Sequence, residues 1–353
     1  PDNARLTVRS ARNDMKIAII NDTRPTHHYG CRLVMENLMN LLHQEQVEVV
    51  WTWPVSTDWR KHRSQIKSMP EVDAFIINGE GTIHHSDERK YAQALIDFAE
   101  FSTTELKKPC YLINATLHKN SADAYRRMAF FRAIFVHDRG SLDELNEAGL
   151  QGQYVPDLTF AKNHKYTGGA TAGTCVIDST IRGDSQKLQD FAAERGFPFR
   201  SMVVARPSNA KFLRSPRPWV KNVIRWLKTD RHISIDPADY ILYLRQFDLV
   251  ITGRYHTVTM CIKNEIPFIA LESNTPKIRY LLSDAINSDK RSMGFQELES
   301  ADLNAYGAFS DDDLERVRAF SKTAELKLES MIAAIVSDAG SNRENAFAYP
   351  EIP

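Results

Sequence analysis

The amino-acid sequence predicts an α/β protein with two parallel-sheet domains that face each other across a cleft. Short apolar runs alternate along the chain with longer amphipathic stretches, which is the pattern of strands and helices in α/β folds. The strand-like runs are apolar throughout, so they suit a parallel sheet covered by helices on both faces. The alternation stops at a polar, glycine-rich stretch, 161–173, and then starts again. With 353 residues, the chain is also long enough for two domains.

The first domain is predicted at 15–160. Its strands are expected at 16–20, 47–53, 74–79, 110–115, 133–137 and 153–157. Its helices are expected at 32–43, 88–105, 122–131 and 141–148. The last helix has Ser141 as the expected N-cap, with Glu144 completing a capping box. Residues 1–14 are polar and carry no apolar periodicity, so we expect an added or disordered leader before a native start at Met15.

The second domain is predicted at 174–339, after a linker at 161–173. Its strands are expected at 174–179, 199–205, 248–253 and 267–272, and its helices at 186–195, 219–228, 237–246, 256–263, 275–282 and 311–336. The polar, turn-rich tail at 340–353 is expected to be disordered.

Composition excludes several classes of function. Basic and acidic residues balance at 45 each, so there is no global electrostatic case for a nucleic-acid partner. No apolar run approaches the roughly 20 residues that span a bilayer. The segment 1–14 has no apolar core of a secretory signal. We therefore expect a cytoplasmic protein without a transmembrane segment, and contact with the inner face of a membrane stays open.

The four cysteines point to buried thiols. Cys31, Cys110, Cys175 and Cys261 are scattered, lie in or beside apolar runs and include no CxxC pair. Disulfide and zinc roles are therefore not expected, and the compartment is expected to be reducing.

Parallel sheets bind ligands beyond the carboxyl ends of their strands, so the residues that follow each apolar run are the candidate site. In "TGRYHTVTMCIKNEIPFIALE" (252–272) the strand stops at Gly253 and a helix is expected from about His256. Arg254 and His256 then lie beside free backbone N–H groups and the positive end of a helix. This arrangement predicts a site for a carboxylate or phosphate, where Arg254 makes a bidentate contact and His256 donates a hydrogen bond or a proton. A purely structural Arg–His pair is the alternative.

A second helix start follows the next strand. "ESNTPKIRY" (272–280) places Ser273, Asn274 and Thr275 before a proline suited to a first helical turn, and Lys277 lies in that turn. Two anion-friendly helix starts suit a phosphorylated donor better than a neutral one. The alternative for Lys277 is a solvated surface lysine.

The first domain supplies candidate groups for an acceptor. The candidates that follow its first, third and fifth strands are Asp22, His27, His28, Gly79, Glu80, Gly81, His84, His85 and Arg139. Two closely spaced glycines let a backbone approach a ligand, although a tight turn explains them equally well. One of the acidic or imidazole groups could act as a general base. The adjacent histidines diverge and no metal-ligand spacing is present, so no metal is expected. Arg139 could instead pair on the surface, and Asp157 could contact the cleft or cap a turn.

Several of these residues resemble a known family. The run Gly253 to Thr257, Ile266–Pro267 at the next strand and Lys277 resemble the C-terminal signature of the polysaccharide pyruvyl transferase family. Gly79 to Gly81, Arg139, Ser141 and Asp157 fit the same pattern in order, so the resemblance spans about 16–285. Glu80 stands where a glycine is common in the family, and the loop His27 to Cys31 also departs from its pattern.

The resemblance implies a fold similar to the two-domain B-type glycosyltransferases (GT-B-like), with two Rossmann-like domains. It implies transfer of pyruvate from phosphoenolpyruvate to a sugar hydroxyl as a ketal, in bacterial-type exopolysaccharide or capsule biosynthesis, without a cofactor. His256 and Arg254 would then engage the donor and the first domain would bind a saccharide or lipid-linked saccharide, with Glu80 or His84 as the base.

Two other functions stay open. A glycosyltransferase of the same fold would hold a nucleotide-activated sugar, with its phosphates at the Thr275 helix start and Glu272 on the ribose. A non-catalytic glycan-binding relative is the third reading, although a binding protein does not need ionisable groups on both sides of a cleft.

Overall fold

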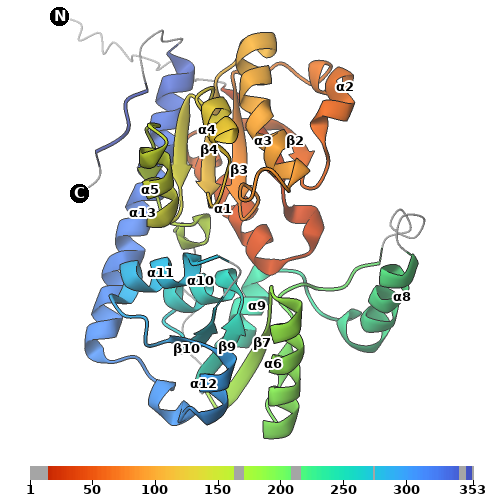
Figure 1. Ribbon diagram of the computed structural model, residues 1–353, viewed down its shortest axis with the longest axis vertical. Coiled ribbons are helices and arrows are strands. Elements are labelled where there is room, and N and C mark those ends of the chain that lie inside the picture. The colour runs from red at the N-terminus through yellow and green to blue at the C-terminus, as the bar shows by residue number, and fades with distance from the viewer. Residues whose placement is uncertain (1–14, 163–170, 208–215, 273–274, 342–346, 352–353) are drawn as a thin grey trace, which may run out of the picture.

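The computed structural model describes residues 15–162, 171–207, 216–272, 275–341 and 347–351. It contains two α/β domains, drawn one above the other in Figure 1, each with a fully parallel sheet. The predicted fold class is therefore confirmed. The expected leader at 1–14 and most of the expected linker, 163–170, lie outside the described residues.

The N-terminal domain has a six-stranded sheet in the order β2-β1-β3-β4-β5-β6. Its strands are β1 (Lys16–Asp22), β2 (Glu48–Pro54), β3 (Ala74–Glu80), β4 (Cys110–Ala115), β5 (Ala133–Val136) and β6 (Gln153–Tyr154). Its helices are α1 (Tyr29–Gln44), α2 (Arg63–Lys67), α3 (Lys90–Phe101), α4 (Ala122–Met128) and α5 (Arg139–Glu147), with short turns η1 (Arg24–Thr26), η2 (Trp59–His62), η3 (Ser102–Leu106) and η4 (Leu158–Phe160).

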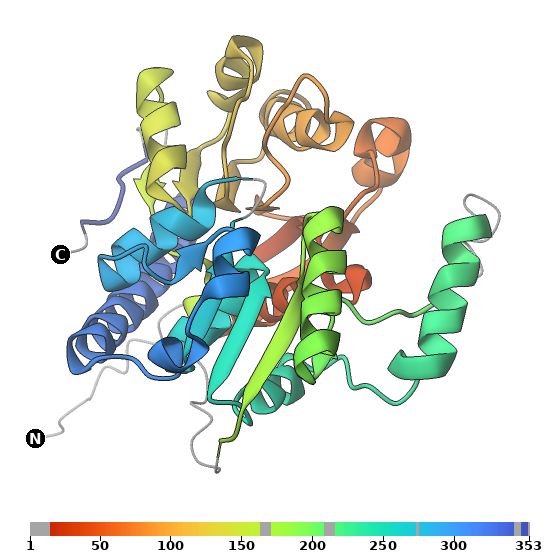
Figure 2. The same ribbon diagram turned by 60° about the horizontal axis from the view of Figure 1, so that its bottom comes forward.

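The C-terminal domain has a five-stranded sheet in the order β11-β10-β9-β7-β8, and Figure 2 brings this domain toward the viewer. Its strands are β7 (Thr174–Ser179), β8 (Phe199–Arg200), β9 (Leu249–Gly253), β10 (Phe268–Leu271) and β11 (Ser292–Met293). Its helices are α6 (Arg182–Arg195), α8 (Pro216–Arg225), α9 (Pro237–Leu244), α10 (Tyr255–Lys263), α11 (Lys277–Ile286), α12 (Phe295–Ser300) and α13 (Asp311–Gly340), with turns η5 (Trp226–Asp230) and η6 (Leu303–Tyr306).

Each sheet has one switch point, where the chain stops adding strands on one side of the first strand and continues on its other side. In the first sheet the chain runs from β1 outward to β2 and then returns to β3 on the other side. In the second sheet it does the same between β7 and β9. Ligands of open parallel sheets bind at such points, beyond the carboxyl ends of the strands. The residues that follow β1, β3, β7 and β9 therefore form the expected site.

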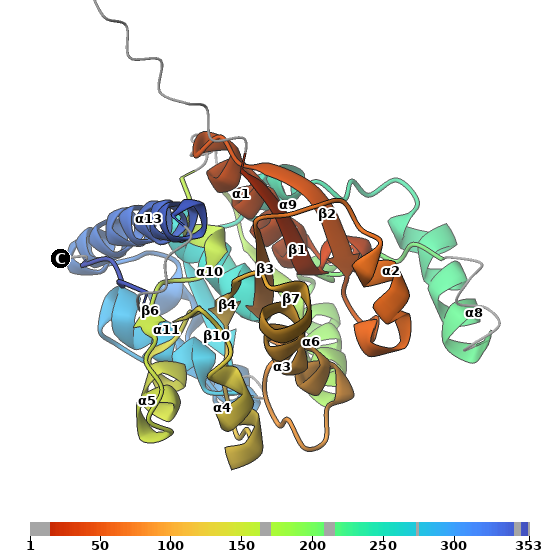
Figure 3. The ribbon, with the colours of Figure 1, turned by 90° about the horizontal axis from the view of Figure 1, so that it is seen from above.

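Both faces of each sheet are buried, which is why the strands are apolar throughout. In β1, Ile17 and Ile19 belong to one apolar cluster, while Ala18 and Ile20 belong to another on the opposite face. The largest cluster is shared by the two domains, because it joins residues of β1, α1 and β4 to residues of β7, α10 and α13. Viewed from above, α13 lies alongside both α1 and α10 (Figure 3).

Three local predictions are corrected. Of the expected strand 199–205 only Phe199–Arg200 pairs in the sheet, because the following residues bond to the other domain: the Tyr29 N–H donates to the Met202 carbonyl, and the Val204 N–H donates to the His27 carbonyl. Asp138, and not Ser141, caps α5, since the Asp138 side chain accepts from the Ser141 N–H. In the tail expected to be disordered, Phe347 is buried against Tyr111 and Phe135.

The described helices include none with the length and apolar character needed to cross a membrane.

Candidate functional site

A cavity of about 210 Å³ lies where the two switch points meet. The N-terminal domain contributes His28, Cys31, Glu80, Gly81, Thr82, His84 and Thr116 to its walls, and the C-terminal domain contributes Thr180, Arg254, Tyr255, His256, Thr275 and Lys277. Three helices, α1, α10 and α11, begin at or beside these residues. Their free N–H groups and dipoles favour a negatively charged ligand.

His256 is paired with a buried carboxylate. Its Nε2 lies 3.6 Å from Oδ2 of Asp157, whose side chain is fully buried. The other oxygen, Oδ1, accepts from the N–H and the hydroxyl of Thr159 and so caps η4. Burial alone would raise the pKa of Asp157, but the charge of His256 and the hydrogen bonds to the carboxylate hold that pKa well below its usual range. An ionised Asp157 therefore places a buried negative charge beside the His256 ring.

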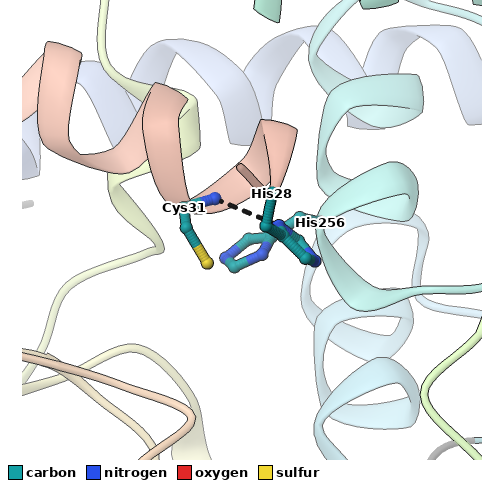
Figure 4. Close-up of side chains that lie close together, drawn as sticks. All are labelled: His28, Cys31 and His256. Atoms are coloured by element: carbon teal, nitrogen blue, oxygen red, sulfur yellow. Dashed lines mark hydrogen bonds between the residues drawn. The ribbon is translucent and has the colours of Figure 1, made fainter. Parts of the chain in front are cut away.

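The first turn of α1 packs directly on His256. His28 caps this helix, since its Nδ1 accepts from the Cys31 N–H at 3.2 Å, and its ring meets the His256 ring edge-on at 5.5 Å (Figure 4). A Cβ added at Gly30 would lie 2.3 Å from Cβ of His256. Burial and the nearby cations His256, Arg254 and Lys277 lower the pKa of His28 well below its usual value, so this imidazole is neutral.

Lys277 is the cation best placed for an anion. Its ammonium lies 4.7 Å from the centre of the Tyr255 ring and 3.4 Å from where a Cβ at Gly81 would stand. Within the described part of the chain, no carboxylate lies within 4.0 Å of it. Burial lowers its pKa, and the more distant Asp157 and Asp138 oppose that effect. Thr275, whose hydroxyl is buried without a hydrogen-bond partner among the described residues, lines the same cavity.

Arg254 is held by the protein itself. Its Nε and Nη2 donate to the two oxygens of Asp178 at 2.9 and 2.6 Å, which is the bidentate geometry that the sequence suggested for a ligand. Asp178 also accepts from the Ser201 hydroxyl and the Met202 N–H. The pair thus fixes the guanidinium at the cavity wall, and Nη1 takes no part in it.

Glu80 occupies a strained position at the end of β3. Its φ is +39°, in the left-handed region that glycine adopts most easily. Its carboxylate accepts from the hydroxyl of Thr23 at 2.7 Å, from Asn78 at 3.2 Å and from the Cys31 thiol at 3.2 Å. A residue other than glycine with this backbone conformation indicates a functional position, because backbone strain of about 1–3 kcal/mol persists only where the surrounding structure enforces it.

His84 is engaged on both ring nitrogens. Its Nδ1 lies 2.7 Å from Nδ1 of His85, and its Nε2 contacts the Arg89 guanidinium. Burial, followed by the charge of Arg89, lowers the pKa of His84 to about 4, so this imidazole is neutral near pH 7.

Other predicted site residues lie away from the cavity walls. Asp22 forms an ion pair with Arg24, Arg139 pairs with Asp284 on α11, and Glu272 pairs with Arg279. His27 ends the turn η1, Gly79 packs against Ala115, and the ring of His85 meets that of His118 edge-on at 5.5 Å. Ser273 and Asn274 lie outside the described residues.

The predicted residues that the structure brings together are His28, Glu80, Gly81, His84, Arg254, His256, Thr275 and Lys277. Cys31, Tyr255 and Asp178 were not predicted. Cys31 and Tyr255 look like core residues in the sequence, and Asp178 closes a buried apolar run. Asp178 could have been predicted, because it lies at the end of a strand. Cys31 and Tyr255 could not, because they meet through the packing of α1 against α10, and that contact produces no regular spacing in the sequence.

One group of side chains in the described structure has metal-ligand geometry. Ligand atoms of His28, Cys31 and His256 lie within 4.8 Å of one another. A metal there would need Cys31 as a thiolate, but burial and the neighbouring Glu80 raise the pKa of that thiol well above its usual value. Lys277 and Arg254 would also repel a cation, so the charges around this group suit an anion better.

Comparisons with known proteins agree with this arrangement. A model of the polysaccharide pyruvyl transferase family matches residues 28–275, which include most of the cavity walls. No curated protein matches the sequence.

Solved structures with the same fold share little sequence. A putative UDP-N-acetylglucosamine 2-epimerase from Listeria monocytogenes is 12% identical over 94% of this chain and 98% of its own, with a TM-score of 0.55. S. aureus MnaA, solved with UDP, is 11% identical over 95% of this chain and 100% of its own, with a TM-score of 0.55. A UDP-forming trehalose-phosphate synthase from Burkholderia vietnamiensis is 11% identical over 93% of this chain and 97% of its own, with a TM-score of 0.52. At such identities the likeness concerns the fold alone.

Proposed function

Because the chain belongs to the polysaccharide pyruvyl transferase family, we propose that this transferase moves pyruvate from phosphoenolpyruvate to hydroxyls of a surface-polysaccharide sugar, or of its lipid-linked precursor, on the cytoplasmic side of the membrane. The observation that carries the proposal is the charge of the cavity. Lys277, Arg254 and His256 meet the N-terminal ends of α1 and α10 within about 210 Å³. Phosphoenolpyruvate is small and carries two anionic groups, a carboxylate and a phosphate.

The size of the cavity favours this donor over a nucleotide sugar. Drug-sized ligands occupy pockets of roughly 300–1,000 Å³, and this cavity is smaller. The nucleotide alternative also uses Glu272 for a ribose, but Glu272 pairs with Arg279 at the surface. Lys277 and the hydroxyl of Thr275 are partners available to the donor among the described residues.

The chemistry begins with proton transfer to the donor. His256, whose Nε2 lies 3.6 Å from the Asp157 carboxylate, gives a proton to the methylene carbon, which becomes a methyl group and leaves positive charge on the central carbon. One sugar hydroxyl adds to that carbon, and phosphate leaves with the electrons of its C–O bond. A second hydroxyl then adds and closes the ketal. Of the two protons lost by the hydroxyls, one restores His256 and the other leaves with the phosphate.

Glu80 is the better candidate for the base that activates a hydroxyl. Its carboxylate lines the cavity on the N-terminal side, opposite Arg254 and Lys277. His84 lines the same wall, but Arg89 occupies its Nε2 and His85 lies against its Nδ1. Removing the Arg89 contact would be necessary before His84 could accept a proton.

The test is release of phosphate from phosphoenolpyruvate with a panel of hexosides as acceptors. His256→Ala should lower turnover by about two to four orders of magnitude, whereas His43→Ala, at an exposed position late in α1, should not. Phosphoenolpyruvate at about 100 times its Kd should also stabilise the native protein by about 2.7 kcal/mol. Lys277→Met should remove most of that stabilisation and the exposed Lys290→Met should not. Stabilisation and turnover with UDP-N-acetylglucosamine, and none with phosphoenolpyruvate, would contradict the proposal.

A further inference from the structure

Helix α8 stands apart from both sheets. It is inserted between β8 and α9, and it projects from the side of the C-terminal domain in two perpendicular views (Figures 1 and 3). Its residues neither line the cavity nor belong to the apolar cluster shared by the two domains. The helical segment 216–230, which consists of α8 and η5, is called the arm below.

The arm is strongly amphipathic. Val220, Val223, Ile224 and Leu227 follow the i, i+3, i+4, i+7 spacing of one helix face. Val220, Ile224 and Leu227 are 45%, 47% and 56% exposed, so three large apolar side chains face solvent side by side. Trp226 adds a half-buried indole next to Leu227. Exposed apolar residues scattered singly need no explanation, but a continuous face of them marks a docking surface.

The rest of the arm is cationic. Arg217, Lys221 and Lys228 are exposed and flank the apolar face along one edge, since they lie seven, three and four residues from Ile224, and no acidic residue precedes Asp230 in the segment. The whole chain has no net charge, so this is a local concentration of positive charge. Among the described residues, Lys221 and Lys228 have no ion-pair partner within 4.0 Å, and these two charges are available to an external anion.

We propose that the arm docks this protein on an anionic phospholipid surface. An apolar face with tryptophan, flanked by lysine and arginine, is the pattern of helices that lie in the plane of a membrane interface. The apolar side chains would enter the acyl boundary, and Lys221 and Lys228 would lie at the level of the phosphates. Charge complementarity selects this occupant over a second copy of the chain, because two cationic arms would repel each other.

The base of the arm is connected to the cavity. Asp230 is buried, accepts from the Ala205 N–H at 2.6 Å and pairs with Arg225 at 2.9 Å. The neighbouring Val203 forms a bridge with His28, which lines the cavity. A docked arm would therefore hold the cavity close to the membrane. If the proposed function is correct, the sugar acceptor would be attached to a lipid.

The test measures flotation with vesicles of phosphatidylcholine, with and without phosphatidylglycerol. The wild-type chain should float with the anionic vesicles, and added salt should weaken that binding. Ile224→Glu/Leu227→Glu and Lys221→Glu/Lys228→Glu should each weaken it by about tenfold or more. Matched controls are Leu326→Glu, an exposed leucine of α13, and Lys187→Glu/Lys290→Glu, and these should bind as the wild type does.

Three results would overturn the proposal. They are a wild-type chain that stays unbound, binding that survives both arm variants, and a dimer in solution that Ile224→Glu/Leu227→Glu converts to a monomer. Quenching of the wild-type tryptophan fluorescence by brominated phospholipids needs no variant, and its absence would also count against docking. Phosphate release with a soluble hexoside should be unchanged in the arm variants, so failure of the docking proposal and failure of the proposed function can be told apart.

Discussion

At the scale of single residues, the cavity depends on a glycine, because a side chain at that position would collide with His256. Gly30 is the second residue of α1, and its Cα faces the ring of His256. Any Cβ there would overlap with atoms close to the backbone of α10, which cannot swing away as the end of a long side chain can. A side chain at position 30 would therefore displace His256, so the close approach of His256 to the N-terminal domain requires a glycine there.

Gly30→Ala tests this dependence. Alanine favours a helix by about 0.5–1 kcal/mol, but overpacking costs about 1–3 kcal/mol, so we expect a net loss of about 1–2 kcal/mol in the free energy of unfolding. Displacement of His256 should lower turnover of phosphoenolpyruvate by about a hundredfold. Urea unfolding and phosphate release measure the two effects.

The matched control is Gly183→Ala. Gly183 is also the second residue of its helix, α6, but a Cβ there has no neighbour within 4 Å. It should leave activity unchanged and stability equal or slightly higher. Equal behaviour of the two variants would show that Gly30 does not position His256.

At the scale of elements, α13 fastens the two domains together. It begins in the C-terminal domain and ends against the N-terminal sheet, where both oxygens of Asp338 accept from Arg132, at 2.7 and 2.9 Å, and the Tyr111 hydroxyl donates to Oδ2 at 2.6 Å. This carboxylate is largely buried, so losing it leaves a guanidinium and a phenol without their partner.

Asp338→Asn should lower the free energy of unfolding by about 2 kcal/mol, since hydrogen bonds to charged groups contribute about 1.5–3 kcal/mol. Asp312→Asn on the same helix is the control. It breaks an exposed i,i+4 pair with Arg316, which water screens, so the loss should be much smaller. Thermal or urea unfolding of the two variants gives the comparison. Equal losses in the free energy of unfolding would show that Asp338 does not hold α13 to the N-terminal sheet.

Elements also show how far sequence reasoning extends. The period of apolar residues predicted the alternating strands and helices, and position after a strand predicted Arg254, His256 and Glu80, because both signals are local. The stretch after Arg200 was wrongly predicted as a strand, since its backbone bonds to His27 and Tyr29 of the other domain. Asp157 and His256 are 99 residues apart, and such a contact leaves no periodic trace in one sequence.

At the scale of the whole molecule, the domains share an apolar core. The largest cluster includes Ile19 and Tyr111 of the first sheet together with Ile177, Val258 and Ile332 of the second domain. Separating the domains would expose this cluster to water, at about 25 cal/mol for each Å² of apolar surface. The relative position of the two cavity walls is therefore part of the folded state.

We predict a single cooperative unfolding transition. In a Trp219→Phe/Trp226→Phe background the remaining tryptophans all lie in the N-terminal domain, with Trp53 and Trp59 buried, so tryptophan fluorescence follows that domain, while far-ultraviolet circular dichroism follows both. Ile96→Ala lies in a cluster of the N-terminal domain alone and should cost about 2–5 kcal/mol. Both signals should still shift together, whereas a shift in the fluorescence transition alone would indicate independent domains.

The division of the cavity between two sheets also bears on how the protein can diverge. Its lining residues follow strand ends and helix starts, and all of them except Tyr255 lie outside the three apolar clusters that hold the fold together. Substitutions around Glu80 in the N-terminal wall, at Thr82, His84 and Thr116, can therefore accumulate without disturbing the wall formed by Arg254 and Lys277. If the proposed function is correct, natural selection can alter the sugar that is recognised while the donor chemistry is inherited intact, so related chains can decorate different polymers with the same acidic group.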